Sequence, residues 1–217
     1  MGAKYNEKLI MLEYIYSGIA LLIAITIHEF SHAFVADKLG DPTPRVNGRL
    51  SLNPLKHLDI LGTIMIFFIH FGWGKPVPID TKYFKKPLPY AALTAIIGPI
   101  SNFILAIIFI SITKYSINFL PNTLKDLFII IALINIYLGV FNLLPFPPLD
   151  GSHILELFIP KKYKNSYDHF LETGYIYLII FIAFDFLLLS KWTGFSILGT
   201  LMDFIAKYIF AFFSLGA

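Results

Sequence analysis

ALLIAITIHEFSHAFVADKLG, residues Ala20–Gly40, contains two histidines and a glutamate within an apolar run that otherwise has the composition of a membrane helix. Ionisable side chains inside a membrane are costly, about 2.5–3.5 kcal/mol each for Asp, Lys or Arg at the centre of a span. They normally face the interior of a helix bundle and serve a function there. On a helix, His28 and His32 lie on one face because they are four residues apart, so both imidazoles can reach one metal ion.

The rest of the chain has the composition of a membrane protein. Of its 217 residues, 57% are hydrophobic and only 14% are charged, whereas about a quarter of the residues of a soluble domain are charged. The sequence therefore predicts an all-α polytopic protein, integral to the lipid bilayer, with about five transmembrane helices. Five apolar runs approach or exceed the roughly 20 residues that a span needs: Tyr14–Val35, Leu88–Thr113, Leu124–Leu144, Leu171–Leu189 and Thr193–Phe213.

No repeat, low-complexity tract or soluble appendage divides the sequence, so residues 1–217 are expected to form a single domain. In the first polar loop, Asn47-Gly48 lies between alternating apolar and polar residues of RVNGRLSL, Arg45–Leu52. This pattern is typical of a two-residue hairpin turn and predicts a small β-ribbon beside the first helix. The net charge of +3 is too small to indicate a nucleic-acid partner, and a chain without cysteine has no disulfides or thiolate metal ligands.

The opening stretch contains the pattern H-E-x-x-H. In this pattern the two histidines bind zinc, and the glutamate, here Glu29, accepts a proton from the attacking water. Asp150 is the most prominent candidate for the third ligand, because it follows a cluster of prolines in FNLLPFPPLDG, Phe141–Gly151, that must break the preceding helix at the membrane boundary. By residue type, eight candidates are open for that third protein ligand: His57, His70, His153, His169, Asp59, Asp150, Asp185 and Asp203.

Together these residues resemble the site-2 proteases, the intramembrane zinc metalloproteases of peptidase family M50, and particularly their short bacterial and archaeal members without appended domains. The resemblance rests on the H-E-x-x-H motif and on an N-x-x-P-x-P-x-x-D-G segment that runs from Asn142 to Gly151. Three further segments take part in it: Gly98-Pro99 with Asn102, LSLNPLKHLD at Leu50–Asp59, and GWGKPVP at Gly72–Pro78.

The resemblance implies the chemistry of the site. His28, His32 and Asp150 would hold one Zn²⁺ per chain, Glu29 would be the general base, and Asn142 would lie near the reacting carbonyl. It also implies a catalytic core at about residues 14–155 with accessory helices at 171–213. The implied function is the hydrolysis of peptide bonds within or near transmembrane segments, as in regulated intramembrane proteolysis.

The implied substrate is a membrane protein whose transmembrane segment is locally unwound, because the carbonyls of an intact helix are hydrogen-bonded and shielded from water. The expected ribbon at Arg45–Leu52 would pair with the unwound strand, and GWGKPVP would shape the entrance. Since no soluble regulatory domain is visible in the sequence, a separate regulatory protein is a further expected partner.

The proposed ligands also constrain the topology. His32 lies near the end of the first span and Asp150 just past Leu124–Leu144, so an even number of crossings must separate them. Leu88–Thr113 and Leu124–Leu144 supply two, and His57–Gly72 is therefore expected to be re-entrant or interfacial. The loops on the catalytic side then hold 11 Lys and Arg against 5 on the other side. The positive-inside rule predicts a multi-pass protein of the cell membrane with its active site toward the cytoplasm.

Three other interpretations stay open. A site of this kind also suits a membrane protein that transports or senses zinc, and a non-catalytic relative of the proteases would bind membrane substrates without cleaving them. A protease of the type that processes prenylated proteins would take a glutamate as its third ligand, and Glu156 and Glu172 each follow a span end. Asn102 either orients a ligand or packs a helix, whereas Asn135 is expected only to link helices.

Overall fold

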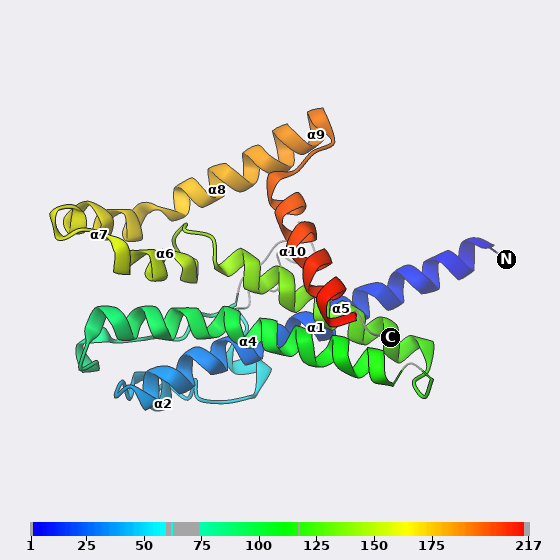
Figure 1. The fold of residues 1–217 in the computed structure, drawn as a ribbon, viewed down its shortest axis with the longest axis horizontal. Coiled ribbons are helices and arrows are strands. Elements are labelled where there is room, and N and C mark those ends of the chain that lie inside the picture. The colour runs from blue at the N-terminus through cyan, green and yellow to red at the C-terminus, as the bar shows by residue number, and fades with distance from the viewer. Residues whose placement is uncertain (1, 60–61, 63–73, 117, 215–217) are drawn as a thin grey trace.

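The computed structural model describes residues 2–59, 62, 74–116 and 118–214, and this part of the chain is helical almost throughout (Figure 1). Over these residues the only β pairing is a single bridge between Leu58 and Gly74. The helices are α1 (Gly2–Lys38), α2 (Thr43–Val46), η1 (Pro54–Lys56), η2 (Thr81–Tyr83), α4 (Pro87–Tyr115), α5 (Asn122–Asn142), α6 (Asp150–Leu155), η3 (Glu156–Phe158), η4 (Lys161–Tyr163), α7 (Lys164–Thr173), α8 (Tyr175–Ala183), η5 (Phe184–Leu189), α9 (Ser190–Thr193) and α10 (Ile197–Ser214).

Within the described residues, four helical segments are long and apolar enough to cross a membrane: Ile10–Lys38, Pro87–Tyr115, Asn122–Asn142 and Tyr175–Thr193. The all-α polytopic architecture is therefore confirmed. The fifth expected span corresponds to α10, whose 18 residues extend about 27 Å. Because α10 is not among the four segments found in the described residues, the count of five stays a prediction.

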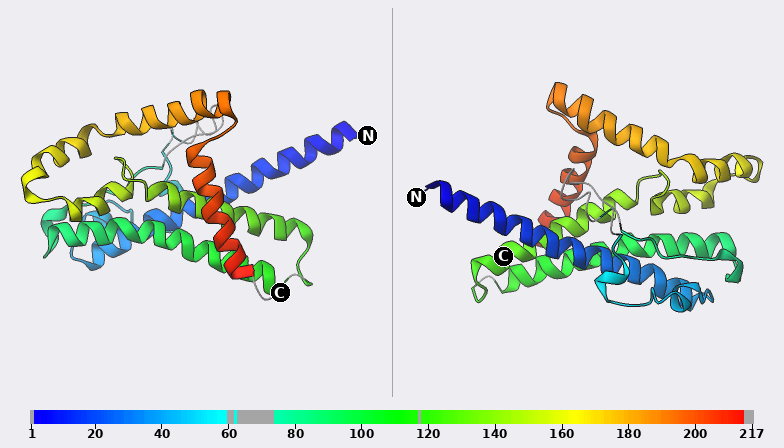
Figure 2. Two further views of the ribbon diagram at one scale, coloured as in Figure 1. Left: turned by 45° about the horizontal axis from the view of Figure 1, so that its top comes forward. Right: turned by 180° about the vertical axis from the view of Figure 1, so that it is seen from behind.

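The centre of the molecule is a bundle of α1, α4 and α5, in which α4 and α5 pack along each other and α1 lies against both (Figures 1 and 2). Small side chains allow the helices to approach closely, as is usual where helices pack within a membrane. Ala106 of α4 and Ala132 of α5 are fully buried in one apolar cluster, and Ala206 of α10 joins them. α10 therefore packs across the bundle at α4 and α5.

After α5 the chain forms the short helix α6, which packs against α4, and then α7, which leads into α8 (Figure 1). Gly174, which joins α7 to α8, packs closely against the ring of Pro147. Nearby, the rings of Phe146 and Phe181 stack with their centroids 5.5 Å apart. Beyond these contacts α8 extends away from the bundle (Figure 2). Its π-helical continuation η5 carries the buried Asp185, which accepts hydrogen bonds from the backbone N–H groups of Ile197 (2.7 Å) and Leu198 and so caps α10.

The β-ribbon predicted at residues 45–52 is wrong. Residues Thr43–Val46 form the short helix α2, which starts after Pro42 and has a further proline, Pro44, in its first turn, where the fixed φ of proline favours a helix. A type I′ hairpin needs positive φ at both turn residues. Gly48 has φ +66°, but Asn47 has φ −83°.

The expected re-entrant segment, residues 57–72, lies largely outside the described residues. The described residues on the two sides of this stretch, however, lie next to each other. Leu58 pairs with Gly74, and the Lys75 N–H donates to the His57 carbonyl at 2.8 Å. Residues 57 and 75 therefore lie next to each other, and the re-entrant course of the segment between them stays a prediction.

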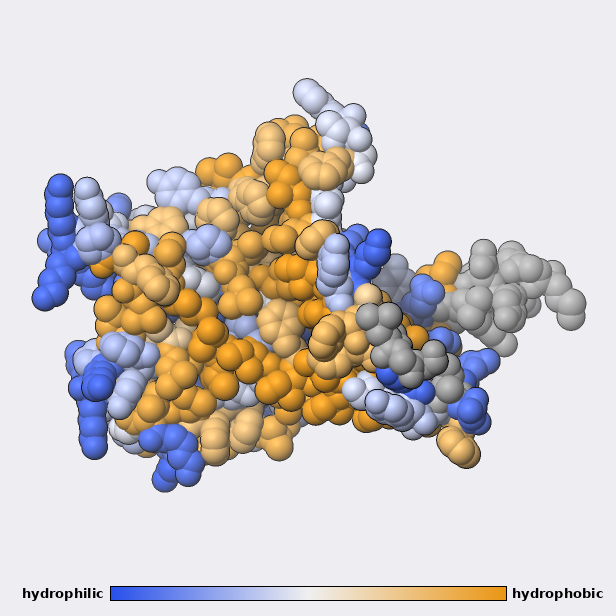
Figure 3. Space-filling view, in the orientation of Figure 1, coloured by the Kyte–Doolittle hydropathy of each residue, from blue (hydrophilic) through white to orange (hydrophobic). Residues whose placement is uncertain are grey.

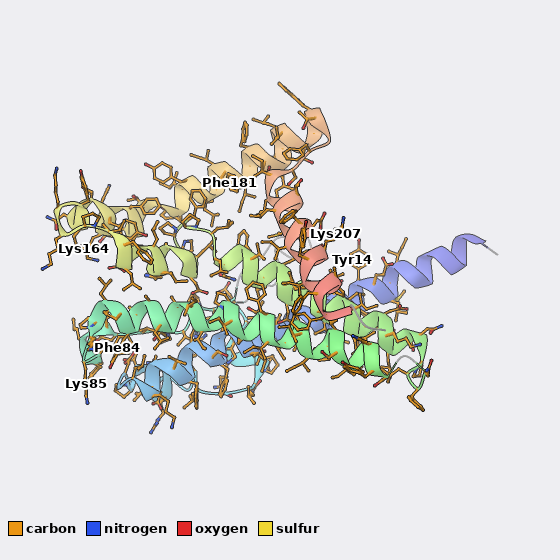
Figure 4. The ribbon with its side chains drawn as sticks, in the orientation of Figure 1. Tyr14, Phe84, Lys85, Lys164, Phe181 and Lys207 are labelled. Carbon is orange, nitrogen blue, oxygen red and sulfur yellow. The ribbon has the colours of Figure 1, made fainter. Side chains whose placement is uncertain are left out.

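The visible surface has the polarity of a membrane protein. Figure 3 shows a broad apolar area over the middle of the molecule with hydrophilic side chains toward its two ends. Lys85 and Lys164 lie at the same end, near the start of α4 and α7 (Figure 4). The long axis of the central bundle therefore runs from one polar end to the other through an apolar region.

Candidate metal centre

Two histidines of α1 and the first residue of α6 converge inside the bundle. The ligand atoms of His28, His32 and Asp150 all lie within 4.8 Å of one another. The two histidine Nε2 atoms are 3.0 Å apart, and they lie 3.1 and 3.3 Å from the oxygens of Asp150. Ligands around a tetrahedral zinc with bonds of about 2.05 Å are separated by about 3.3 Å. The spacing therefore fits one zinc ion.

The outer nitrogens of both rings have acceptor partners. His28 Nδ1 lies 2.7 Å from Asn102 Oδ1, and His32 Nδ1 lies 2.6 Å from the carbonyl oxygen of Thr94. An oxygen acceptor requires a proton on Nδ1, so each neutral ring presents the lone pair of Nε2 to the centre. Two residues of α4 thus set the tautomer that a zinc-binding histidine needs.

A buried chain of amides continues from this contact. Asn102 donates to Asn135 Oδ1 at 2.9 Å and to the Ala24 carbonyl at 3.2 Å, and Asn135 in turn donates to the Ile131 carbonyl at 2.8 Å. These bonds join α1, α4 and α5 around His28. Asn135 does link helices, as expected, but its partner is the same Asn102 that orients a candidate ligand.

Gly98 lets α4 approach the two histidines. A Cβ at this position would lie 2.7 Å from His28 Cε1 and still closer to His32 Nε2. Any side chain would therefore occupy the space of the imidazoles. The sequence contains Gly98-Pro99, but without the fold nothing in it shows that this glycine faces H-E-x-x-H.

Asp150 is held at the start of α6 by a tight turn. Gly151 packs against the carbonyl of Leu143, so the chain doubles back after the prolines and carries the carboxylate to α1. Asp150 Oδ2 is buried and makes no hydrogen bond among the described residues, although it lies 3.1 Å from His28 Nε2. With the His28 proton on Nδ1, that nitrogen and the carboxylate oxygen are both acceptors, and two acceptors that face each other favour a cation between them.

Glu29 lies beside the ligands and is anchored by one oxygen. Its Oε2 accepts a hydrogen bond from the Val77 N–H at 2.9 Å and lies 4.0 Å from the Arg49 guanidinium. The segment predicted to shape the entrance, GWGKPVP, therefore touches the candidate base through its last residues. Sequence reasoning did not identify Arg49.

Asn142 is the last residue of α5, and its amide donates to the Leu138 carbonyl at 2.9 Å. No described contact joins it to the three converging side chains. Among the described residues, none of the other candidate ligands belongs to the group that His28 and His32 form with Asp150. Asp203 accepts from Tyr137, and Glu156 pairs with Lys164, so the alternative with Glu156 as third ligand loses its basis. His70 lies outside the described residues.

A bundle of membrane-crossing helices around a buried His/His/Asp centre, with a glutamate beside it, defines a polytopic membrane metalloprotein. The model of peptidase family M50 matches residues 109–184. YwhC of Bacillus subtilis is 40% identical over 176 residues, which are 77% of this chain and 80% of YwhC. The chain therefore belongs to peptidase family M50.

Two further relatives agree with this assignment. Rip2 of Mycobacterium tuberculosis (strain Erdman) is 28% identical over 75% of this chain and 64% of Rip2. MJ0392 of Methanocaldococcus jannaschii is 28% identical over 67% of this chain, but the match covers 34% of that longer protein. All three relatives bear the name of zinc metalloproteases, and the chain is a zinc metalloprotease of this family. No solved structure matches it significantly.

Proposed function

We propose that this metalloprotease cleaves peptide bonds within or beside the transmembrane segments of other membrane proteins. His28, His32 and Asp150 hold its zinc, and Glu29 is the general base. The observation that carries the proposal is that the two histidines lie well inside a helix of membrane-crossing length, far from its end. His32 and His28 lie six and ten residues before Lys38, the end of α1, which places them about 9–15 Å from that end.

Zinc bound at this centre supplies a Lewis acid that polarises the scissile carbonyl and makes water a stronger nucleophile. The protein side chains supply orientation and proton transfer. Asn102 and Thr94 hold the Nδ1 protons of the two imidazoles, so that Nε2 is turned inward. Glu29, anchored through Oε2, has Oε1 available to take a proton from the attacking water and return it to the leaving amine.

Asn142 is proposed to lie near the scissile carbonyl of the bound substrate. It occupies the end of α5, seven residues after the buried Asn135, and is only partly buried. Its amide is bonded to Leu138 within its own helix. A side-chain rotation that breaks this bond would let the amide donate to the developing oxyanion, which is a stabilising interaction of the kind that such catalysis uses.

The proposed substrate is a transmembrane segment that has locally unwound, because only then is a backbone carbonyl open to water. Strand pairing at residues 45–52 is not part of the proposal, because these residues form no ribbon. Residues 75–78 shape the entrance instead. Their backbone donors are already used, since Lys75 bonds His57, Val77 bonds Glu29, and the two prolines have no N–H.

We also propose one catalytic domain over residues 1–217, with its core at 14–155 and accessory helices at 171–213. The active site faces the cytoplasmic side of the cell membrane. The excess of Lys and Arg on the loops of the catalytic side supports this orientation. A separate regulatory protein is a further proposed partner.

Cleavage of a single-span test protein by the purified enzyme tests the proposal. Glu29→Gln should keep its zinc and lose cleavage, since the ligands remain while the proton acceptor is gone. Glu13→Gln is the matched control, because Glu13 lies on the same helix with its side chain exposed. Normal zinc content with undiminished cleavage in Glu29→Gln would reject the assigned role of Glu29.

A further inference from the structure

Arg49 is a buried cation beside the proposed base. Its side chain is only 5% exposed, although arginine is almost never fully buried unless it is paired. It donates hydrogen bonds to the carbonyl oxygens of Lys75 and Pro76, the latter at 2.9 Å. The same guanidinium lies 4.0 Å from Glu29 Oε2. Arg49 thus joins three groups that belong to two separate parts of the chain.

The segment that Arg49 holds carries the backbone donor to Glu29. Val77 N–H donates to Glu29 Oε2 at 2.9 Å, and Val77 is flanked by Pro76 and Pro78. Neither proline has an N–H. A shift of this segment by one residue would therefore place a proline opposite the carboxylate and remove the hydrogen bond. The register of residues 75–78 decides whether Glu29 is anchored.

The geometry of the guanidinium suits this task. A planar arginine fork can donate to two carbonyl oxygens and face a carboxylate at once, whereas the ammonium of lysine acts as a compact point charge. Burial lowers the pKa of the Arg49 guanidinium, while Glu29 acts in the opposite direction. The group stays charged because arginine is not deprotonated in proteins. Two carbonyl dipoles and one carboxylate offset the desolvation of this charge.

We propose that Arg49 is a positioning residue for the general base. It fixes the register of residues 75–78, so that the Val77 N–H holds Glu29 Oε2 and leaves Oε1 to handle the proton. This inference rests on the proposed function, since it assigns Glu29 as the base. No described contact joins Arg49 to the three converging ligands, so it acts through Glu29.

Arg49→Gln tests the proposal, with Arg45→Gln as the matched control. Arg45 lies four residues earlier, is 67% exposed and pairs with Asp37 at the surface. Arg49→Gln should keep its zinc and lose about 10- to 100-fold in kcat, which corresponds to one charged hydrogen bond. Its kcat should fall by a larger factor than its KM changes, because the segment that Arg49 holds anchors the base Glu29.

Hydrogen exchange gives a second readout that does not depend on cleavage. Peptides that cover residues 74–78 should exchange faster in zinc-loaded Arg49→Gln than in Arg45→Gln, because the anchored amides lose their register. Unchanged exchange in this segment, or the same kcat in both variants, would overturn the proposal. If Arg49→Gln loses zinc or unfolds, Arg49→Lys takes its place in both measurements. Wild-type kcat in Arg49→Lys, or loss of zinc there too, also overturns the proposal.

The two hypotheses fail in different ways. If the wild-type enzyme does not cleave, or Glu29→Gln cleaves as well as wild type, the proposed function fails. In that case, faster exchange at residues 74–78 in Arg49→Gln would still show that Arg49 holds this segment in place. If the wild-type enzyme cleaves and Glu29→Gln does not, wild-type kcat and exchange in Arg49→Gln would reject the role of Arg49 alone.

Discussion

Gly98→Ala should weaken zinc binding without removing any ligand. The added Cβ would lie 2.7 Å from His28 Cε1 and closer still to His32 Nε2, whereas unstrained carbon contacts lie at about 3.5–4.0 Å. The imidazoles or α4 must therefore move by about 1 Å. Metal–ligand distances tolerate only about 0.2 Å. Overpacking of this kind costs about 1–3 kcal/mol, which corresponds to a loss of about 5- to 150-fold in zinc affinity.

The zinc affinity is measured by equilibrium dialysis of the purified protein against buffered zinc, followed by metal analysis. Gly18→Ala is the control, because Gly18 lies on α1 and a Cβ there meets nothing within 4 Å. Both substitutions gain up to about 1 kcal/mol of helix propensity. A difference in zinc affinity between the two variants therefore reports the steric overlap of the new Cβ with the histidines. Wild-type zinc affinity in Gly98→Ala would refute the reasoning, because the imidazoles would then have room that the structure does not give them.

Three further predictions concern the ligands and the topology. Asp150→Ala should lower the zinc content sharply while Asp203→Ala should not, since Asp203 is bonded to Tyr137 and not to the centre; metal analysis that finds full zinc in Asp150→Ala rejects this ligand. Asn102→Ala should weaken zinc binding by about 10- to 100-fold through loss of the partner of His28 Nδ1, and unchanged affinity in dialysis would contradict it. Single cysteines at Thr81 and Asn122 should react with an impermeant thiol reagent from inside and outside the cell, respectively; labelling of both from one side would disprove the topology.

Local patterns in the sequence predicted the elements that depend on near neighbours. Long apolar runs predicted helices of membrane-crossing length, because a span must satisfy its backbone hydrogen bonds within itself. The separation of four residues placed His28 and His32 on one face of α1, since that geometry is internal to a helix. The parity of the crossings predicted a re-entrant segment, and the bridge between Leu58 and Gly74 is compatible with it.

The hairpin predicted from a local pattern did not form, because the residues just before it start a helix. Asn47-Gly48 is a strong hairpin signal, but Pro42 and Pro44 start a helix just before it. Asn47 consequently keeps a negative φ of −83° and cannot form the turn that a ribbon requires. The polar loop then carries Arg49 inward to residues 75 and 76 rather than outward into a strand pair.

The sequence by itself thus determined the class of protein, its helices of membrane-crossing length and the placement of His28 and His32 on one face of a helix, because each depends on residues within a few turns of one another. Only the tertiary structure decided that Asp150, more than a hundred residues after His32, meets both histidines at about 3 Å. It also decided that Asn102 bonds His28 and that Gly98 lies against both imidazoles. These contacts depend on how α1, α4 and α5 are rotated and shifted against one another, and helix packing, unlike helix formation, is a property of surfaces that lie far apart in the chain.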